Sequence, residues 1–347
     1  MGDLMSSIGQ GVCQQSLHSA ARLTSLAIAF AMAFLVALSG SLAPTAARAA
    51  DTVVTGVLGS YTSGVWPFLI GMRKGFFDRH NIKPDVVFAP TAPGLVQQLA
   101  AGSLDIIAVN GLVEPLHAVE KGAPVAIMRI IGQTPNYVMI GRSNIADLKG
   151  LKGKKIAIGG LRDINKIYLD RVLIPNGLKD GDYDIIVIGA TGARFAALKS
   201  GAIDATMLVP PFNFTAIKSG FKSFGLVRDY AGDLPQTGMQ ISKRWAARNP
   251  QQAKAINQVI DESVTWLYDR RNRDEAIDIL TTAAKVNREE IAESYDFLVG
   301  IDFFARTSEI KRTPLNTMMK EMVAIKDMAS VIPIESLLVP GLNTVVD

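Results

Sequence analysis

The chain carries one short pattern twice, and this repeat constrains its fold more than any other feature. LAAGSLDI at residues 99–106 reappears as LKSGAIDA at 198–205, with leucine, glycine, an aliphatic residue and aspartate in the same register. Apolar runs typical of β-strands precede both copies, at 86–89 and 185–188. This order predicts an α/β protein of two similar lobes, each a mixed, mainly parallel sheet flanked by helices. Because open α/β sheets bind ligands at the carboxyl ends of their strands, two facing lobes predict a cleft.

The glycine and aspartate of each copy have structural interpretations. Gly102 and Gly201 suit the left-handed residue that closes a helix, and Asp105 and Asp204 stand where a short apolar strand begins. The alternative is a catalytic pair of carboxylates. Each aspartate lies at the strand end opposite the one that faces ligand, so we predict that both cap turns.

The first 49 residues differ in composition from the rest. A nearly apolar stretch, 23–40, follows Arg22, and Ala47 and Ala49 supply the small residues that an exported-protein peptidase recognises. We predict a signal peptide at 1–49, cleaved after about Ala49; the alternative is an uncleaved membrane anchor. Cys13 is the chain's one cysteine. Cleavage would therefore leave a protein without thiol catalysis, disulfides or cysteine metal sites.

Composition indicates an ordinary globular protein of about two domains, since 48% of the 347 residues are hydrophobic and 20% are charged. The formal net charge is +4, and loss of 1–49 would remove one positive charge from it. The basic cluster 149–155 is broken by two glycines and leads into an apolar strand, so we interpret it as a solvated turn and expect no nucleic-acid partner. His80 and His117 lie far apart, without partners at the spacing of a metal site or catalytic triad.

One segment imitates a dinucleotide-binding fingerprint. Residues 188–195, IGATGARF, follow a strand and open a helix, but Phe195 stands where the fingerprint needs its third glycine. Asp204 opens its strand and is not the acidic residue expected after a second strand. We therefore predict no cofactor, and a dinucleotide-dependent oxidoreductase is the weakest alternative.

Two crossings connect the predicted lobes. Pro135 interrupts an apolar run, and 230–239 is the predicted return. The predicted domains are the signal peptide and three further segments: 50–135 and 232–347 as the two parts of lobe one, and 136–231 as an inserted lobe two. From Pro250 onward the pattern is helical, and we expect these helices to pack on lobe one.

Candidate ligand-binding residues lie in the loops where strands lead into helices, because backbone N–H groups at helix starts are free to bind acceptor oxygens. We expect Trp66 and Phe212 to be incompletely buried without a ligand, and Arg162 to pair with a carboxylate or sulfonate. The predicted ligand-binding residues of lobe one and the hinge are Ser60, Tyr61, Thr62, Trp66, Thr91, Asn110 and Asn136. Those of lobe two are Arg162, Asp163, Asn165, Thr191, Pro211 and Phe212.

Four segments in this order resemble one known family. They are GMRKGFF at 71–77, LAAGSLDI at 99–106, DLKGLKGKKIA at 147–157 and ALKSGAIDA at 197–205. The chain resembles the periplasmic substrate-binding proteins of ABC importers, in the branch that takes up nitrate, taurine and other sulfonates, and thiamine-pyrimidine precursors. The resemblance spans about 52–345.

The resemblance implies a type II periplasmic-binding-protein fold, in which two lobes closing on a small solute are joined by two crossing strands that act as a hinge. It implies a periplasmic monomer that docks on the permease of an ABC importer. The solute remains open among sulfonates, carboxylates and pyrimidines. A relative of this fold makes a thiamine pyrimidine with a cysteine-rich segment and a histidine. The processed chain has no cysteine, so we predict a binding protein and keep an exported enzyme on this fold as the alternative.

Overall fold

The computed structural model describes residues 50–59 and 61–347. The predicted signal peptide, its cleavage site and Ser60 lie outside the described residues. No helix within the described ranges is long and apolar enough to cross a membrane.

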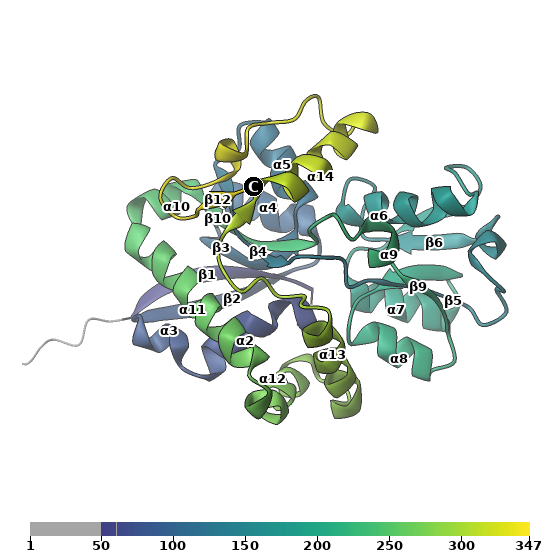
Figure 1. Ribbon diagram of the computed structural model, residues 1–347, viewed down its shortest axis with the longest axis horizontal. Coiled ribbons are helices and arrows are strands. Elements are labelled where there is room, and N and C mark those ends of the chain that lie inside the picture. Colours follow the sequence, from purple (N-terminus) through teal and green to yellow (C-terminus); the bar gives the residue numbers. More distant parts are fainter. Residues whose placement is uncertain (1–49, 60) are drawn as a thin grey trace, which may run out of the picture. The chain divides into compact units, whose positions relative to one another are not determined.

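The first sheet combines strands from distant parts of the sequence (Figure 1). Its order is β2-β1-β3-β10-β4, formed by β1 (Asp51–Leu58), β2 (Ile82–Ala89), β3 (Ile106–Gly111), β4 (Val125–Gly132) and β10 (Thr237–Ser242). Strand β1 runs parallel to β2 and β3, and β10 runs antiparallel to β3 and β4. Every residue of β4 is buried, as expected of a strand covered on both faces.

Helices cover both faces of this sheet. The first part of the chain supplies η1 (Ser63–Val65), α2 (Trp66–Arg73), α3 (Phe76–Arg79), α4 (Ala92–Ala101) and α5 (Val113–Glu120). Later residues supply α10 (Lys243–Arg248), α11 (Pro250–Tyr268), η4 (Arg270–Asn272), α12 (Arg273–Ala284) and α13 (Arg288–Gly300). Helix α11 packs on α2 and α3, and α12 packs on α2. The predicted return of the later helices to the first sheet is confirmed.

The second sheet is built from one continuous stretch, coloured teal in Figure 1. Its order is β7-β6-β8-β5-β9, formed by β5 (Val138–Gly141), β6 (Lys155–Ile158), β7 (Asp184–Val187), β8 (Ala205–Leu208) and β9 (Lys222–Leu226). Its helices are η2 (Leu148–Leu151), α6 (Ile164–Leu173), η3 (Ile174–Asn176), α7 (Thr191–Ser200), α8 (Phe212–Lys218) and α9 (Arg228–Ala231). Strand β6 is parallel to β7 and β8, whereas β5 is antiparallel to β8 and β9.

The repeated pattern occupies equivalent places in the two sheets. Gly102 and Gly201 close α4 and α7 in the left-handed conformation, with φ of +86° and +80°. Asp105 Oδ2 accepts a hydrogen bond from Val54 N at 2.8 Å, and Asp204 Oδ2 accepts one from Lys155 N at 2.9 Å. The structural role of both aspartates is confirmed, although each carboxylate binds a neighbouring strand, β1 or β6, instead of its own turn.

Two segments connect the sheets. Residues 133–137 lead from β4 to β5, and 232–236 lead from α9 into β10. The two segments are joined by a reciprocal pair of side chains. Asn136 N donates to Gln236 Oε1 at 2.5 Å, and Gln236 Nε2 donates to Asn136 Oδ1 at 2.8 Å.

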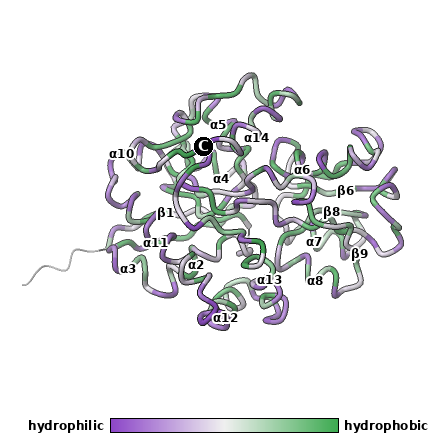
Figure 2. Tube along the Cα trace, in the orientation of Figure 1, coloured by the Kyte–Doolittle hydropathy of each residue, from purple (hydrophilic) through white to green (hydrophobic). Residues whose placement is uncertain are grey.

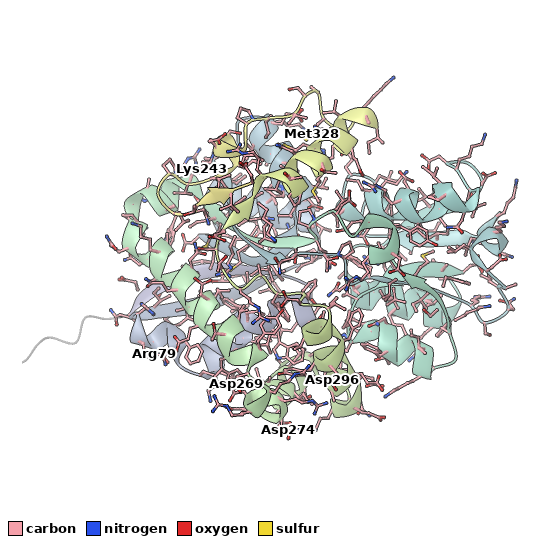
Figure 3. The ribbon with its side chains drawn as sticks, viewed as in Figure 1. Arg79, Lys243, Asp269, Asp274, Asp296 and Met328 are labelled. Atoms are coloured by element: carbon pink, nitrogen blue, oxygen red, sulfur yellow. The ribbon has the colours of Figure 1, made fainter. Side chains whose placement is uncertain are left out.

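The C-terminal segment, yellow in Figure 1, contains β11 (Ile310–Lys311), α14 (Arg312–Ala324), η5 (Ile334–Leu337) and β12 (Val345–Val346). Met318, Met319 and Met322 of α14 belong to one apolar cluster with Ile127 of the first sheet and Ile156 of the second. Hydrophobic residues concentrate along the strands in Figure 2, and α12 is hydrophilic on its outer side. Ion pairs lie there, including Arg273 with Asp296 at 2.7 Å; Asp296 is labelled in Figure 3.

Candidate functional site

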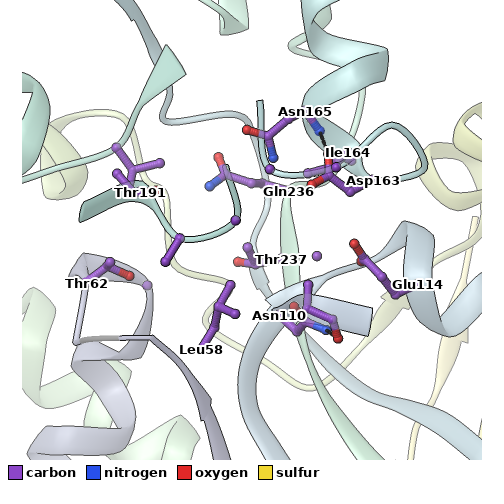
Figure 4. A pocket seen from close by; sticks show the side chains of 18 of the residues that line it. Leu58, Thr62, Asn110, Glu114, Asp163, Ile164, Asn165, Thr191, Gln236 and Thr237 are labelled. Atoms are coloured by element: carbon purple, nitrogen blue, oxygen red, sulfur yellow. Dashed lines mark hydrogen bonds between the residues drawn. The ribbon is translucent and has the colours of Figure 1, made fainter. Parts of the chain in front are cut away.

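A cavity of about 500 Å³ lies between the two sheets. Its walls are the loops after the carboxyl ends of β1, β2, β3, β6, β7 and β8, together with the two connecting segments (Figure 4). Both halves of the repeat thus contribute the strand ends at which α/β sheets bind ligands.

Most of the predicted site residues line this cavity. They are Thr62, Thr91, Asn110, Asn136, Arg162, Asp163, Asn165 and Thr191. Two of them also cap helices: Thr91 Oγ1 accepts from Gly94 N at 3.2 Å, and Asp163 Oδ1 accepts from Asn165 N at 2.7 Å. The structure brings these residues together from both sheets, and their contact with a solute stays a prediction.

Trp66 lies in the core, away from the cavity. Its side chain is 0% exposed, its Nε1 donates to Ala276 O at 2.8 Å, and its ring meets Tyr295 edge-on. The expectation of incomplete burial was wrong, because α12 and α13 cover this position. Those helices follow Trp66 by some 200 residues, and its local sequence gives no sign of them.

Tyr61, Pro211 and Phe212 do not line the cavity either. The Tyr61 ring packs on Phe88, with ring centroids 5.2 Å apart. Phe212 is half-buried and packs against Phe195, with ring centroids 6.0 Å apart. Pro211 follows a cis peptide bond and precedes the first residue of α8. Each residue lies near a strand end, as predicted, but faces a neighbouring side chain or backbone outside the cavity lining.

Arg162 lines the cavity, but its charge already has a protein partner. Arg162 Nε donates to Asp327 Oδ1 at 2.6 Å, and Nη2 donates to Asp327 O at 2.9 Å. His117 Nε2 lies 2.7 Å from Asp327 Oδ2. This cluster joins α5, the loop before α6 and the segment after α14. In this structure Asp327 is the partner of Arg162, whose side chain is 56% exposed, and the pairing of Arg162 with a ligand carboxylate or sulfonate stays a prediction.

Sequence reasoning missed Arg194, which lines the cavity from α7 and is only 2% exposed. Its Nη1 donates to Ile188 O at 3.3 Å and also to Gly189 O, and its Nη2 donates to Thr191 Oγ1 at 3.0 Å. Arg194 belongs to the segment that imitates a dinucleotide fingerprint. Its place in the first turn of a helix after a strand was the signal that could have identified it.

Glu114, in the first turn of α5, was also missed. It is 6% exposed, and its Oε2 has no hydrogen-bond partner within the described part of the chain. Burial raises the pKa of Glu114 to about 8, and the negative charges of Asp163 and Asp327 add to the rise. Burial likewise raises the pKa of Asp163 to about 6, although the Arg194 charge and hydrogen bonds oppose that rise. The two carboxyl groups titrate as a pair.

The loop after β6 needs glycine because of this crowded polar group. A Cβ atom at Gly159 would collide with Asp163 Oδ2 and would lie 3.3 Å from both Arg194 Nη1 and Asn165 Nδ2. Figure 4 shows the Glu114 carboxyl group directed toward the loop that carries Asp163. Further polar side chains come from the connecting segment and β10, namely Gln236 and Thr237.

Contacts between the two halves surround the cavity. Ser63 Oγ donates to Pro210 O at 2.9 Å, and a Cβ atom at Gly189 would lie 3.1 Å from Pro90 O. Arg171 of α6 binds Glu321 of α14, with Nε donating to Oε2 at 3.1 Å. On another side, Lys218 of α8 pairs with Glu289 and Glu293 of α13. No group of three or more His, Cys, Asp or Glu side chains in the described ranges is placed to hold a metal ion.

Comparison with known proteins places this architecture in a family. The family described as "NMT1/THI5 like" matches residues 63–273. A Bacillus subtilis (strain 168) protein that carries the name of an aliphatic sulfonates-binding protein is 28% identical over 236 residues, which are 65% of this chain and 68% of that protein.

Solved structures show the same fold. The alkanesulfonate-binding protein SsuA from Xanthomonas axonopodis pv. citri, bound to MOPS, has a TM-score of 0.68 and 17% identity, covering 85% of this chain and 98% of that one. The periplasmic nitrate-binding protein NrtA from Synechocystis PCC 6803 has a TM-score of 0.61 and 17% identity, covering 71% and 70%. The predicted periplasmic-binding-protein fold is confirmed, and the chain belongs to the NMT1/THI5-like family.

Proposed function

We propose that this protein is the extracytoplasmic solute-binding component of an ABC importer and that it catalyses no reaction. The observation that carries the proposal is the cavity of about 500 Å³, which is lined by polar side chains from both sheets. That volume suits one small organic molecule. Binding between two halves also gives the solute a means of holding them together.

The family and the similar proteins support the same role. The Bacillus subtilis relative and two of the similar structures carry the names of proteins that bind sulfonates or nitrate. We extend the role to this chain with the signal peptide at 1–49, a periplasmic location, and delivery as a monomer to the membrane permease. The proposed lobes are 50–135 with 232–347, and 136–231.

The test is saturable binding that depends on both lobes. The full chain is screened by thermal shift against sulfonates, carboxylates and nitrogen compounds, and hits are titrated by calorimetry. We expect Asn110→Ala in the first lobe and Thr191→Ala in the second each to lower the affinity for the hit about tenfold. This loss is roughly the contribution of one buried hydrogen bond.

Thr317→Ala is the matched control, since Thr317 is exposed on α14 and bonds only its own helix at Thr313 O. It should leave affinity unchanged. Chemical conversion of the hit, or affinity that responds to neither cavity variant, would contradict the proposed function.

A further inference from the structure

The cavity holds buried polar atoms that lack a protein partner, and most of them are acceptors. Asn110 Oδ1, Glu114 Oε2 and Asn165 Oδ1 have no hydrogen-bond partner among the described residues. Each belongs to a lining residue that is at most 6% exposed. Buried polar groups in proteins are almost always hydrogen-bonded, so these oxygens require donors from whatever fills the cavity.

Among the fully buried side-chain atoms of the lining, donors without a partner are scarcer. Arg194 Nε is without a partner in the described chain, but the rest of that guanidinium is committed to Ile188 O, Gly189 O and Thr191 Oγ1. Thr237 Oγ1 is also without a partner there and can either donate or accept. A ligand that offers only acceptors would leave the Asn110 and Asn165 oxygens unsatisfied, and of the three groups only Glu114, in its protonated form, could donate to it.

Once Glu114 is ionised, charge favours the same kind of ligand. Glu114 and Asp163 bring two carboxyl groups to the cavity, whereas Arg194 brings one guanidinium. The other lining arginine, Arg162, is neutralised by Asp327. The first turn of α6, an anion-binding position in other proteins, is occupied by the Asp163 carboxylate, which accepts from Asn165 N.

We propose, on the basis of the proposed function, that the solute is a small organic cation with N–H donors, such as an amine, amidine or guanidine, bound through its nitrogen to Glu114 and Asp163. A simple alkanesulfonate or nitrate has no hydrogen to offer to Asn110 Oδ1 or Asn165 Oδ1, and its negative charge would face the Asp163 carboxylate. This chain therefore differs in solute class from the sulfonate and nitrate binders that share its fold.

Binding of such a cation releases a proton. Burial raises the pKa of Glu114 to about 8, so the group is mostly protonated at pH 7. The charged groups that act on it are Asp163 before α6 and Asp327 after α14, the latter itself paired with Arg162 and facing His117. A cation on Glu114 stabilises the carboxylate and displaces its proton, whereas an anion would require protons to be taken up.

The experiment is calorimetry on the full chain at pH 7 in phosphate and in Tris, whose ionisation enthalpies differ. The cationic probes are benzamidine, agmatine and putrescine, and the anionic probes are ethanesulfonate and nitrate. We expect at least one cation to bind saturably, with an enthalpy difference between buffers that corresponds to proton release. Glu114→Gln and Asp163→Asn should each lower the affinity for that cation about tenfold or more, and Glu114→Gln should also abolish most of the proton release.

Glu275→Gln is the matched control, because the Glu275 side chain is 52% exposed on α12 and its ion-pair partner Lys74 belongs to the same half; this variant should change neither the affinity nor the proton release. Circular dichroism establishes that each variant is folded. If only one of the two cavity variants folds, that variant alone is sufficient to test the proposal. Failure of all three cations to bind overturns the proposal. Anion binding in that case leaves the proposed function standing with another solute class, whereas the absence of any ligand in the wider screen contradicts the proposed function itself.

Discussion

Burial of Glu114 opposes ionisation of its carboxyl group, because the group is 6% exposed and its Oε2 has no hydrogen-bond partner in the described chain. A carboxyl group whose folded pKa is raised binds more protons in the native state than in the unfolded state. Stability then falls as pH rises from the unfolded pKa near 4.5 to the folded value of about 8, and changes little through this group at higher pH.

Replacing Glu114 with Gln removes that penalty. We expect Glu114→Gln to unfold at the same urea concentration as the natural chain at pH 4.5 and to be more stable by about 1–3 kcal/mol at pH 8.5. Urea denaturation of the unliganded protein at the two pH values measures the difference. Equal stability of the two proteins at pH 8.5 would contradict the unpaired burial of this group.

Sequence reasoning identified site residues where the local order of strand, loop and helix sufficed. Asp163 and Thr191 could be placed because each follows a strand and begins a helix. Glu114 could not be placed in this way, because its surroundings include the loop of Asp163 and the segment of Asp327, which are distant in the sequence. The prediction for Trp66 was wrong for the same reason, because Ala276 and Tyr295 of later helices cover its side chain.

At the scale of elements, the repeat places the same carboxylate contact in both sheets. Asp105 holds the start of β3 to β1, and Asp204 holds the start of β8 to β6. We expect Asp105→Ala and Asp204→Ala each to lower the free energy of unfolding by about 1–2 kcal/mol.

The double variant should lose approximately the sum, because the two contacts lie in different sheets and share no partner. Chemical denaturation of the single and double variants measures this. A double variant no less stable than either single variant would show that the two contacts are not independent. The matching sequences made these elements predictable, but the helices that cover each face could be assigned only in general terms.

At the scale of the whole described molecule, contacts between the halves limit how closely the cavity walls can approach. Gly189 faces the Pro90 carbonyl across the boundary, and an added Cβ atom would lie 3.1 Å away. We expect Gly189→Ala to weaken solute binding by about three- to tenfold, since closure must then displace one backbone against the other. The melting temperature of the unliganded protein should hardly change.

Gly300→Ala is the matched control, because a Cβ atom there meets nothing within 4 Å. Titration calorimetry of both variants with the same solute measures the effect, and equal affinity would contradict it. The repeat predicted two lobes and a cleft. It could not predict the distance between them, which depends on cross-contacts such as Ser63 with Pro210 that have no counterpart in local sequence.

The reciprocal amide pair of Asn136 and Gln236 has one further consequence. Both residues belong to the segments about which the halves would turn, and both also line the cavity. Under the proposed function, a solute that hydrogen-bonds to either amide would bear directly on the link between the halves, so its match to this pair would influence how the halves are held.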